Sequence, residues 1–426
     1  MFKLWERITG LHRSVFATLL CNIIEHYDFI VYGILSPTIS RVFFLNDSRF
    51  SDDAYIASFM SFLVFATAFL ARPLGALLFG YIGDKKGRKV ALNASTLLLV
   101  FSTLGMALLP TPSVLGIYSI ILLSILRIMQ GLAYGAETGG VVLMAESVGD
   151  RGIRIIWSVR IILCAFSMIV GVMTLKVSEA MLSVEQMQVW GWRIPFMGAV
   201  LISFSIPYLR GLIRESTEYI EYKSSSASKS ESPMKATSLL KNIGVILLVT
   251  SMASLSSGFF YIPVVYLEIG RESKFLEYEF SLVLLALCAS TGIFVSDFAK
   301  RRISFICCLC AIVLCAYPVM HFIREGYMAA RLMSAVLSGL YLGWYGSFVI
   351  FLFPIEVRQR CFSLGYSGGY LMGALAPALC LWFYHNTGFD TMPGLYLTVL
   401  SSIILVVFVF LVKVNDKGRY VLQFAS

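Results

Sequence analysis

The chain has 426 residues, of which 58% are hydrophobic and only 14% are charged, and its mean hydropathy is +0.80. Soluble proteins carry about 25% charged residues. This composition therefore excludes an ordinary water-soluble protein and predicts one that spans a membrane. The net charge of +9 would also suit a nucleic-acid-binding protein, and the placement of the charges decides between the two.

Twelve apolar stretches follow one another along the chain, each long enough to cross a bilayer as a helix. Because a backbone in lipid must satisfy its own hydrogen bonds, all twelve are predicted to be helical. We expect an all-α membrane protein with helices at 14–40, 54–82, 90–109, 114–145, 156–176, 194–212, 242–267, 280–298, 303–323, 329–353, 362–385 and 393–412.

Lys and Arg are distributed unevenly between the two sides of the predicted membrane. With the N-terminus inside, the inner segments hold 24 of the 34 basic residues and the outer segments eight, whereas acidic residues divide evenly. This bias is the positive-inside signature, and it explains the basic charge without nucleic acid. We expect a monomer in the plasma membrane, the inner membrane of a bacterium, with both termini cytoplasmic.

A polar, Ser-rich stretch at 210–241 divides the chain into 1–209 and 242–426, each with six apolar stretches. Its run KSSSASKSES is typical of a flexible linker. We therefore expect an N-terminal six-helix bundle, a cytoplasmic linker and a C-terminal six-helix bundle.

The two halves also show weak sequence similarity. Asp84 and Arg88, after the second stretch, are followed by Asp297 and Arg301 at the same offset of 213 residues. Duplicated helical bundles are typical of transporters that rock two halves about a central site.

Five motifs occur in a fixed order along the chain: NIIEHYDF at 22–29, ARPLG…GDKKGRK at 71–89, RIMQG…ETGG at 127–140, WGWRIPF at 190–196 and FPIEVR at 353–358. Together they resemble the major facilitator superfamily, and more narrowly its metabolite:proton symporter branch, which includes proline/betaine, α-ketoglutarate and shikimate carriers. The resemblance implies two pseudo-symmetric six-helix bundles and proton-driven transport by alternating access. The chain departs from the usual pattern at His26, where an aromatic residue normally follows the glutamate.

Three ionisable residues lie near the middle of predicted helices: Glu25 and Asp28 on one face of the first, and Arg127 in the fourth. Charges at this depth are costly and usually functional. Arg127 is predicted to bind a substrate carboxylate with its planar guanidinium, with Glu25 beside it, and Glu25 or Asp28 to carry the proton. A static ion pair between helices is the alternative. His26 is a further candidate for the proton site, or a packing residue.

A second pair of opposite charges, Arg72 and Glu137, lies at equal depth nearer the cytoplasmic ends of their helices. Equal depth predicts a salt bridge near the inner mouth. The family resemblance implies that charges in the neighbouring loops close the cytoplasmic side: Asp84, Arg88 and Glu146, with Asp297 and Arg301 in the second half.

Aromatic residues mark the tenth stretch, where Tyr341, Trp344 and Tyr345 fall on one side of the helix. We expect them to shape a pocket that faces Arg127. One arginine, acids and aromatic rings suit a small carboxylate or a zwitterion such as proline or betaine, and the sequence does not choose between these.

Other classes of protein fit less well. The four histidines show no metal-ligand spacing and no phosphate-binding loop is present, so we expect neither an enzyme nor an ATP-driven pump, with no cofactor or metal and the proton as coupling ion. An uncoupled facilitator and a transporter-like sensor remain alternatives.

The topology gives the first test. Reporter fusions after Ser228 and after Ser426 should both report the cytoplasm, and a fusion after Thr387 should report the outside. An external signal from the Ser228 fusion would overturn the helix count that places every residue discussed above.

Overall fold

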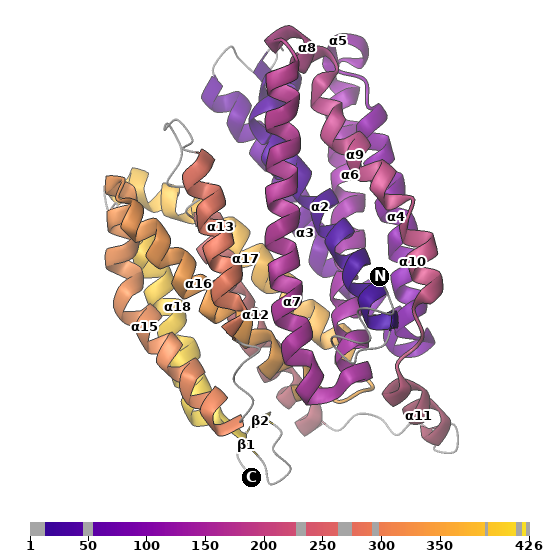
Figure 1. Ribbon diagram of the computed structural model, residues 1–426, viewed down its shortest axis with the longest axis vertical. Helices are drawn as coiled ribbons and strands as arrows, with labels where there is room; N and C mark the ends of the chain where they lie inside the picture. Colours follow the sequence, from indigo (N-terminus) through magenta and orange to yellow (C-terminus); the bar gives the residue numbers. More distant parts are fainter. Residues whose placement is uncertain are drawn as a thin grey trace. The chain divides into compact units, whose positions relative to one another are not determined.

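A computed structural model of the chain is almost entirely helical (Figure 1). The part of the chain that it describes comprises residues 13–45, 54–226, 236–262, 275–291, 298–387, 391–414 and 420–422.

The helices agree with the predicted spans. Ten helical segments among the described residues are long and apolar enough to cross a membrane. The two remaining predicted stretches, 280–298 and 362–385, fall on α13 (Phe275–Ala289) and α17 (Arg358–Thr387). The described residues of all twelve stretches are thus predominantly helical, and the all-α membrane fold is confirmed.

The chain forms two compact units, and the first comprises residues 1–140 and 166–215. In it, α3 packs against α6 and α4, and α2 packs against α3, α9 and α10. Its described elements are α2 (Arg13–Ser40), a π-helical turn (Arg41–Leu45), α3 (Ala54–Lys86), α4 (Arg88–Leu108), α5 (Pro112–Leu115), α6 (Ile117–Tyr134), the two ends of α7 (Glu137–Met181), α8 (Val184–Val189), a 3₁₀ turn (Gly191–Arg193), α9 (Ile194–Ser203) and α10 (Ile206–Leu212).

The second unit comprises residues 141–165, the middle of α7, and 216–426. In it, α12 packs against α17, α15 against α18 and α16, and α13 against α16. A short antiparallel ribbon near the C-terminus pairs Val412 with Leu422 and Val414 with Tyr420. Its other elements are α11 (Thr217–Ser226), α12 (Ala236–Tyr261), α15 (Phe298–Glu325), α16 (Met328–Val349), a 3₁₀ turn (Ile350–Leu352), α18 (Met392–Leu411), β1 (Val412–Val414) and β2 (Tyr420–Leu422).

The predicted stretches 114–145 and 156–176 are connected within α7 by a sharper turn than the loop that was expected. Helix extends into that loop from both sides, and the two helices meet at Gly149, whose φ of 67° and ψ of −172° are non-helical and are adopted by glycine at little cost. Between α6 and α7, Gly135 and Ala136 keep right-handed helical angles. In the predicted linker, α11 shows that residues 217–226 are helical, whereas 227–235 lie outside the described residues.

Glycines allow the backbones of α3 and α6 to touch. A Cβ atom added to Gly131 would lie 2.1 Å from the carbonyl oxygen of Ala68, and one added to Gly75 would lie 2.0 Å from that of Leu132. Small residues are what membrane helices use for close approach, because lipid provides no hydrophobic force between them. This crossing fixes the position of α6, which carries Arg127.

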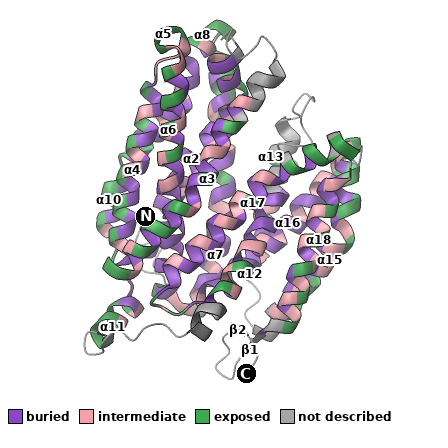
Figure 2. Cartoon of the chain, turned by 180° about the vertical axis from the view of Figure 1, so that it is seen from behind, coloured by how far each residue is buried: buried purple, intermediate pink, exposed green. Residues whose placement is uncertain are grey.

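The polarity of the described surface is the reverse of that of a soluble protein. Large apolar side chains such as Leu74, Leu97 and Phe101 are exposed, whereas Arg88 and Arg127 are completely buried. In Figure 2 the exposed residues lie along the outward sides of α4 and α15 and the buried ones on the sides that face other helices. Such a chain fits a hydrocarbon solvent and keeps its charges among the helices.

Candidate functional site

One face of α2 carries a row of buried polar side chains. Asn22, Glu25, Asp28 and Tyr32 follow one another at intervals of three or four residues and are all buried. That spacing puts side chains on one side of a helix. Each of the four makes a polar contact with a different part of the unit, so α2 is tied to its neighbours through its polar face.

Asp28 is held by uncharged donors from two helices. The hydroxyl of Thr103 in α4 lies 2.6 Å from both carboxylate oxygens and donates to them. The amide nitrogen of Gln130 in α6 donates to Asp28 Oδ2 at 3.1 Å and to the Asp28 carbonyl oxygen at 3.3 Å. Asp28 is completely buried, so its environment in this unit is polar but largely closed to water.

Gln130 connects Asp28 to Arg127. The Gln130 side-chain oxygen accepts a hydrogen bond from Arg127 Nη1 while its nitrogen donates to Asp28. Arg127 Nη2 donates to the carbonyl oxygen of Phe65 at 3.4 Å. The predicted neighbours Arg127 and Asp28 are therefore brought together, and a neutral amide that both of them contact lies between them.

Aromatic rings surround the guanidinium of Arg127. Its central carbon lies 4.3 Å from the ring centroid of Tyr32, 5.2 Å from that of Phe29 and 5.4 Å from that of Phe65. Cation–π contacts of this kind stabilise a charge that water does not reach, by about 0.5–2 kcal/mol each. The rings keep the guanidinium charged and fixed in position within the bundle.

Glu25 has a different partner from the one expected. Its carboxylate pairs with Arg210 of α10, and the hydroxyl of Thr96 donates to it at 3.5 Å. The prediction placed Glu25 beside Arg127 and left Arg210 where the predicted stretch 194–212 and the predicted linker 210–241 overlap. In the structure Arg210 is a buried residue of α10, which ends at Leu212.

The predicted ion pair between Arg72 and Glu137 is present, with 3.1 Å between Arg72 Nη2 and Glu137 Oε2. Both side chains are almost fully buried. Asn22 of α2 donates to the other carboxylate oxygen at 2.9 Å, and the Arg72 guanidinium lies 4.5 Å from the Tyr134 ring. The pair thus joins α3, α7 and α2. Its role as a gate stays a prediction.

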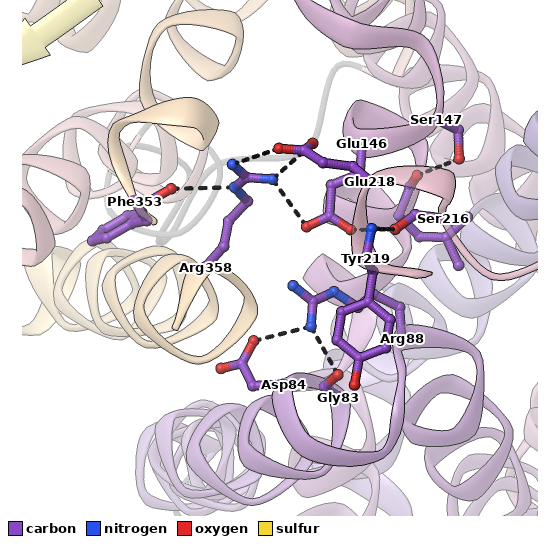
Figure 3. Close-up of polar contacts among 11 residues, drawn as sticks. Gly83, Asp84, Arg88, Glu146, Ser147, Ser216, Glu218, Tyr219, Phe353 and Arg358 are labelled. Carbon is purple, nitrogen blue, oxygen red and sulfur yellow. Dashed lines mark hydrogen bonds and ion pairs between the residues drawn. The ribbon is translucent and has the colours of Figure 1, made fainter. Parts of the chain in front are cut away.

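The other residues predicted for the inner gate, where their side chains are described, fall into two separate groups of ion pairs. In the first unit, Arg88 Nη1 contacts Asp84 Oδ1 at 3.2 Å and the Gly83 carbonyl oxygen at 2.8 Å (Figure 3). Asp297 lies outside the described residues, and so does the side chain of Arg301.

Glu146, which the prediction grouped with Asp84 and Arg88, forms its ion pair with Arg358 in the second unit. The two side chains are 3.1 Å apart, and Arg358 also contacts Glu218 at 3.0 Å (Figure 3). Ser216 donates to the other oxygen of Glu146 at 2.7 Å. The middle of α7, the start of α17 and α11 are therefore held together by charge.

The aromatic residues of α16 pack within the second unit. Tyr341 donates to the Met252 carbonyl oxygen at 2.8 Å, and Trp344 donates to the Thr291 hydroxyl at 3.1 Å. Tyr341 and Tyr345 are stacked, with 5.3 Å between ring centroids, and Tyr345 meets Trp157 edge to face. A pocket facing Arg127 stays a prediction. His26, half-buried on α2, lies on a different face from Glu25 and Asp28.

Several polar residues that make these contacts were not predicted from the sequence. Gln130 is one turn from Arg127 on the same face of its helix, a spacing that could have linked the two. Arg160 lies inside the predicted stretch 156–176 but was not among the candidate site residues. It is buried in α7, with its guanidinium 5.4 Å from the Trp157 ring. Thr103 carried no signal, since threonines are common in membrane helices.

Known proteins resemble this chain over most of its length. The family described as "Sugar (and other) transporter" matches residues 14–242. The inner membrane metabolite transport protein YhjE of Escherichia coli (strain K12) is 28% identical over 94% of this chain and 93% of the relative. The citrate-proton symporter of Klebsiella pneumoniae is 28% identical over 88% of this chain and 86% of the relative. The proline/betaine transporter of Salmonella typhimurium is 27% identical over 92% of this chain and 82% of the relative.

Solved structures show the same fold. The major facilitator superfamily proton:xylose symporter XylE, bound to 6-bromo-6-deoxy-D-glucose, superposes with a TM-score of 0.70 over 92% of this chain and 94% of that one. The sequence identity is 13%, so this likeness concerns the fold alone.

The buried pair of Arg72 and Glu137 generates the second prediction. Arg72→Gln or Glu137→Gln alone leaves an uncompensated buried charge, which costs about 3–5 kcal/mol. The double variant should recover part of that loss in a double-mutant cycle of thermal unfolding in detergent.

The exposed pair of Lys176 and Glu179, 3.0 Å apart, is the matched control, because exposed pairs contribute at most about 1 kcal/mol. Additive losses for Arg72 and Glu137 would show that the two residues act independently.

Proposed function

We propose that this chain, which belongs to the sugar (and other) transporter family of the major facilitator superfamily, carries a small organic carboxylate or zwitterion across the membrane together with protons. The family and the relatives named above make the chain a membrane transporter rather than an enzyme. The substrate and its coupling to protons are the proposal. An inner-membrane location with both termini in the cytoplasm belongs to it, supported by the relative YhjE and by the distribution of basic residues.

The observation that carries the proposal is the hydrogen-bonded chain from Thr103 through Asp28 and Gln130 to Arg127. It combines a buried cation with a buried acid, which is what a carrier of an anion and a proton requires. Arg127 supplies the substrate contact, since a guanidinium binds a carboxylate through two parallel hydrogen bonds. Asp28 supplies the proton site.

Gln130 gives this pair a means of coupling. A substrate carboxylate that binds Arg127 Nη1 competes with the Gln130 oxygen for the same donor. Once Gln130 loses that bond, its amide is free to turn, and the hydrogen bonds that hold Asp28 change with it. Substrate at Arg127 and a proton at Asp28 are then thermodynamically linked, so each alters the affinity for the other.

The aromatic rings around Arg127 favour recognition of the acidic end of a substrate. A quaternary ammonium group binds to the open face of an aromatic ring. The rings of Tyr32, Phe29 and Phe65 already contact the Arg127 guanidinium, and a second cation there would be repelled. A carboxylate is common to citrate, proline and betaine, so this contact serves either kind of substrate.

The remaining ion pairs suit the alternating opening of a transporter. Arg72 with Glu137, Asp84 with Arg88 and Glu146 with Arg358 each join different helices or adjacent turns. We assign them to the inner gate, where such bonds hold one conformation and release in the other. Coupled transport also distinguishes this proposal from an uncoupled facilitator or a sensor, because only a symporter concentrates substrate when a proton gradient is applied.

The third prediction concerns Arg127. Proteoliposomes with purified protein should accumulate labelled citrate or proline when the inside is made alkaline, and less without the gradient. Arg127→Lys keeps the charge but loses the paired hydrogen bonds, which contribute about 1.5–3 kcal/mol when one partner is charged. Substrate affinity should therefore fall about tenfold to a hundredfold.

Arg193→Lys is the matched control. Arg193 also lies over an aromatic ring, that of Trp192 at 4.3 Å, and donates to two carbonyl oxygens, but these belong to Val189 and Leu109 and not to the α2 face. Normal binding by Arg127→Lys would show that Arg127 is structural and would end the carboxylate assignment.

A further inference from the structure

We propose that Glu25 and Arg210 form a second proton site in the first unit, at which Glu25 binds the proton and Arg210 displaces it. The inference rests on the proposed proton coupling. The sequence already made Glu25 a candidate for the proton site, and the new element is Arg210 as the cation that displaces the proton. It concerns the end of the unit at which α2 begins, one helical turn from Asp28.

Contacts place this pair closer than Asp28 to one end of the bundle. Arg210 lies in the last turn of α10, which ends at Leu212. The backbone N–H of Arg214, just beyond, donates to the hydroxyl of Ser14 at 3.0 Å, and Ser14 is the second residue of α2. The end of α10 therefore lies beside the beginning of α2, the predicted cytoplasmic end. Glu25 is nearer to it than Asp28 is.

The hydrogen bonds of Arg210 differ from those of a fully satisfied ion pair. Arg210 is 4% exposed, and its Nη2 pairs with Glu25. Its Nε and Nη1 are buried and have no hydrogen-bond partner among the described residues. A buried donor without an acceptor costs about 1–3 kcal/mol. Two such donors beside a carboxylate leave Arg210 able to exchange Glu25 for another acceptor, as a displacing cation must.

The two acids of α2 have complementary surroundings. Asp28 is held by the neutral donors Thr103 and Gln130, whereas Glu25 is held directly by a guanidinium. A proton that arrives at Glu25 neutralises one half of an ion pair, and re-forming that pair drives the proton off. Glu25 is thus suited to release, and Asp28 to uptake.

The transfer balances in charge and atoms. The acidic proton of Asp28 passes to the carboxylate of Glu25, which leaves Asp28 ionised and separates Glu25 from Arg210. The proton then moves from Glu25 to water at the α2 end, and the Glu25 carboxylate pairs with Arg210 again. No other bond is formed or broken.

Other groups near Glu25 do not replace it. Of the charged residues close to it, Glu137 of α7 is paired with Arg72, and Asp28 is the proposed donor. Helix α4 contributes the neutral Thr96, and the thiol of Cys21 lies one turn earlier on α2. Arg210 is thus the cation in direct contact with Glu25 among the described residues.

Infrared difference spectroscopy of the purified full-length protein tests the proposal with the proton itself as the probe. Changing the pH over about 5 to 9 should give a carbonyl band of a protonated carboxylic acid that Glu25→Gln removes. Arg210→Gln should keep the band but move its midpoint by about 1–3 pH units, the usual effect of an opposite charge within contact distance. Arg210→Lys should restore part of the wild-type midpoint.

Glu179→Gln, which removes an exposed glutamate of an ion pair, controls for the loss of one carboxyl and should keep the Arg210-dependent band. If a single variant fails to fold, Glu25→Gln with Arg210→Gln has no uncompensated charge and should lack the band. A band that survives without Glu25, or a midpoint unchanged in Arg210→Gln, would overturn the proposal. Because this readout needs no substrate, failure of transport coupling alone would leave it standing.

Discussion

The arrangement of the buried side chains depends on the cost of placing a charge among membrane helices. An ionised side chain at the centre of a bilayer costs at least about 2.5–3.5 kcal/mol even on the most permissive scale, so the chain keeps such groups only where a partner holds them. In the first unit the partners converge on one face of α2. Asn22, Glu25 and Asp28 reach α7, α10, α4 and α6, and the apolar remainder of the surface faces lipid.

Those contacts divide into two kinds with different consequences. Arg72 and Glu137 form a direct ion pair that gains a further hydrogen bond from Asn22, an arrangement that holds three helices in register. Arg127 and Asp28 are instead connected through a neutral amide. An amide is easier to displace than a counter-ion, because the amide carries no net charge of its own that displacement would leave unpaired. The proposed substrate and proton sites are therefore placed at the contact that runs through the amide.

The sequence predicts the fold well because membrane helices follow a simple rule of length and polarity. It also finds the contact of Arg72 with Glu137, since equal depth and opposite sign are readable along the chain. It fails for Glu25, because the helix on which its partner lies depends on how α2 is rotated against α10. Arg210 itself is also hard to assign from the sequence, because it follows apolar residues and precedes a polar segment.

Packing between distant helices limits the remaining predictions. The pairing of Glu146 with Arg358 requires the start of α17 to approach the middle of α7, and no local pattern specifies that approach. The polar atoms of Tyr341 and Trp344 have partners on α12 and beside α13, and the spacing of these residues along α16 does not specify either partner. The kink at Gly149 is similarly a property of a single backbone angle.

In the proposed mechanism, substrate binding at Arg127 and proton binding at Asp28 are linked. Proton uptake by the purified protein in weakly buffered detergent, recorded with a pH indicator when the transported compound is added, measures that link directly. We expect proton uptake by the wild-type protein and by His26→Gln, and none by Asp28→Asn, although Asp28→Asn should still bind the compound. Binding without proton uptake in the wild-type protein, or uptake lost in His26→Gln and retained in Asp28→Asn, would contradict the proposed mechanism.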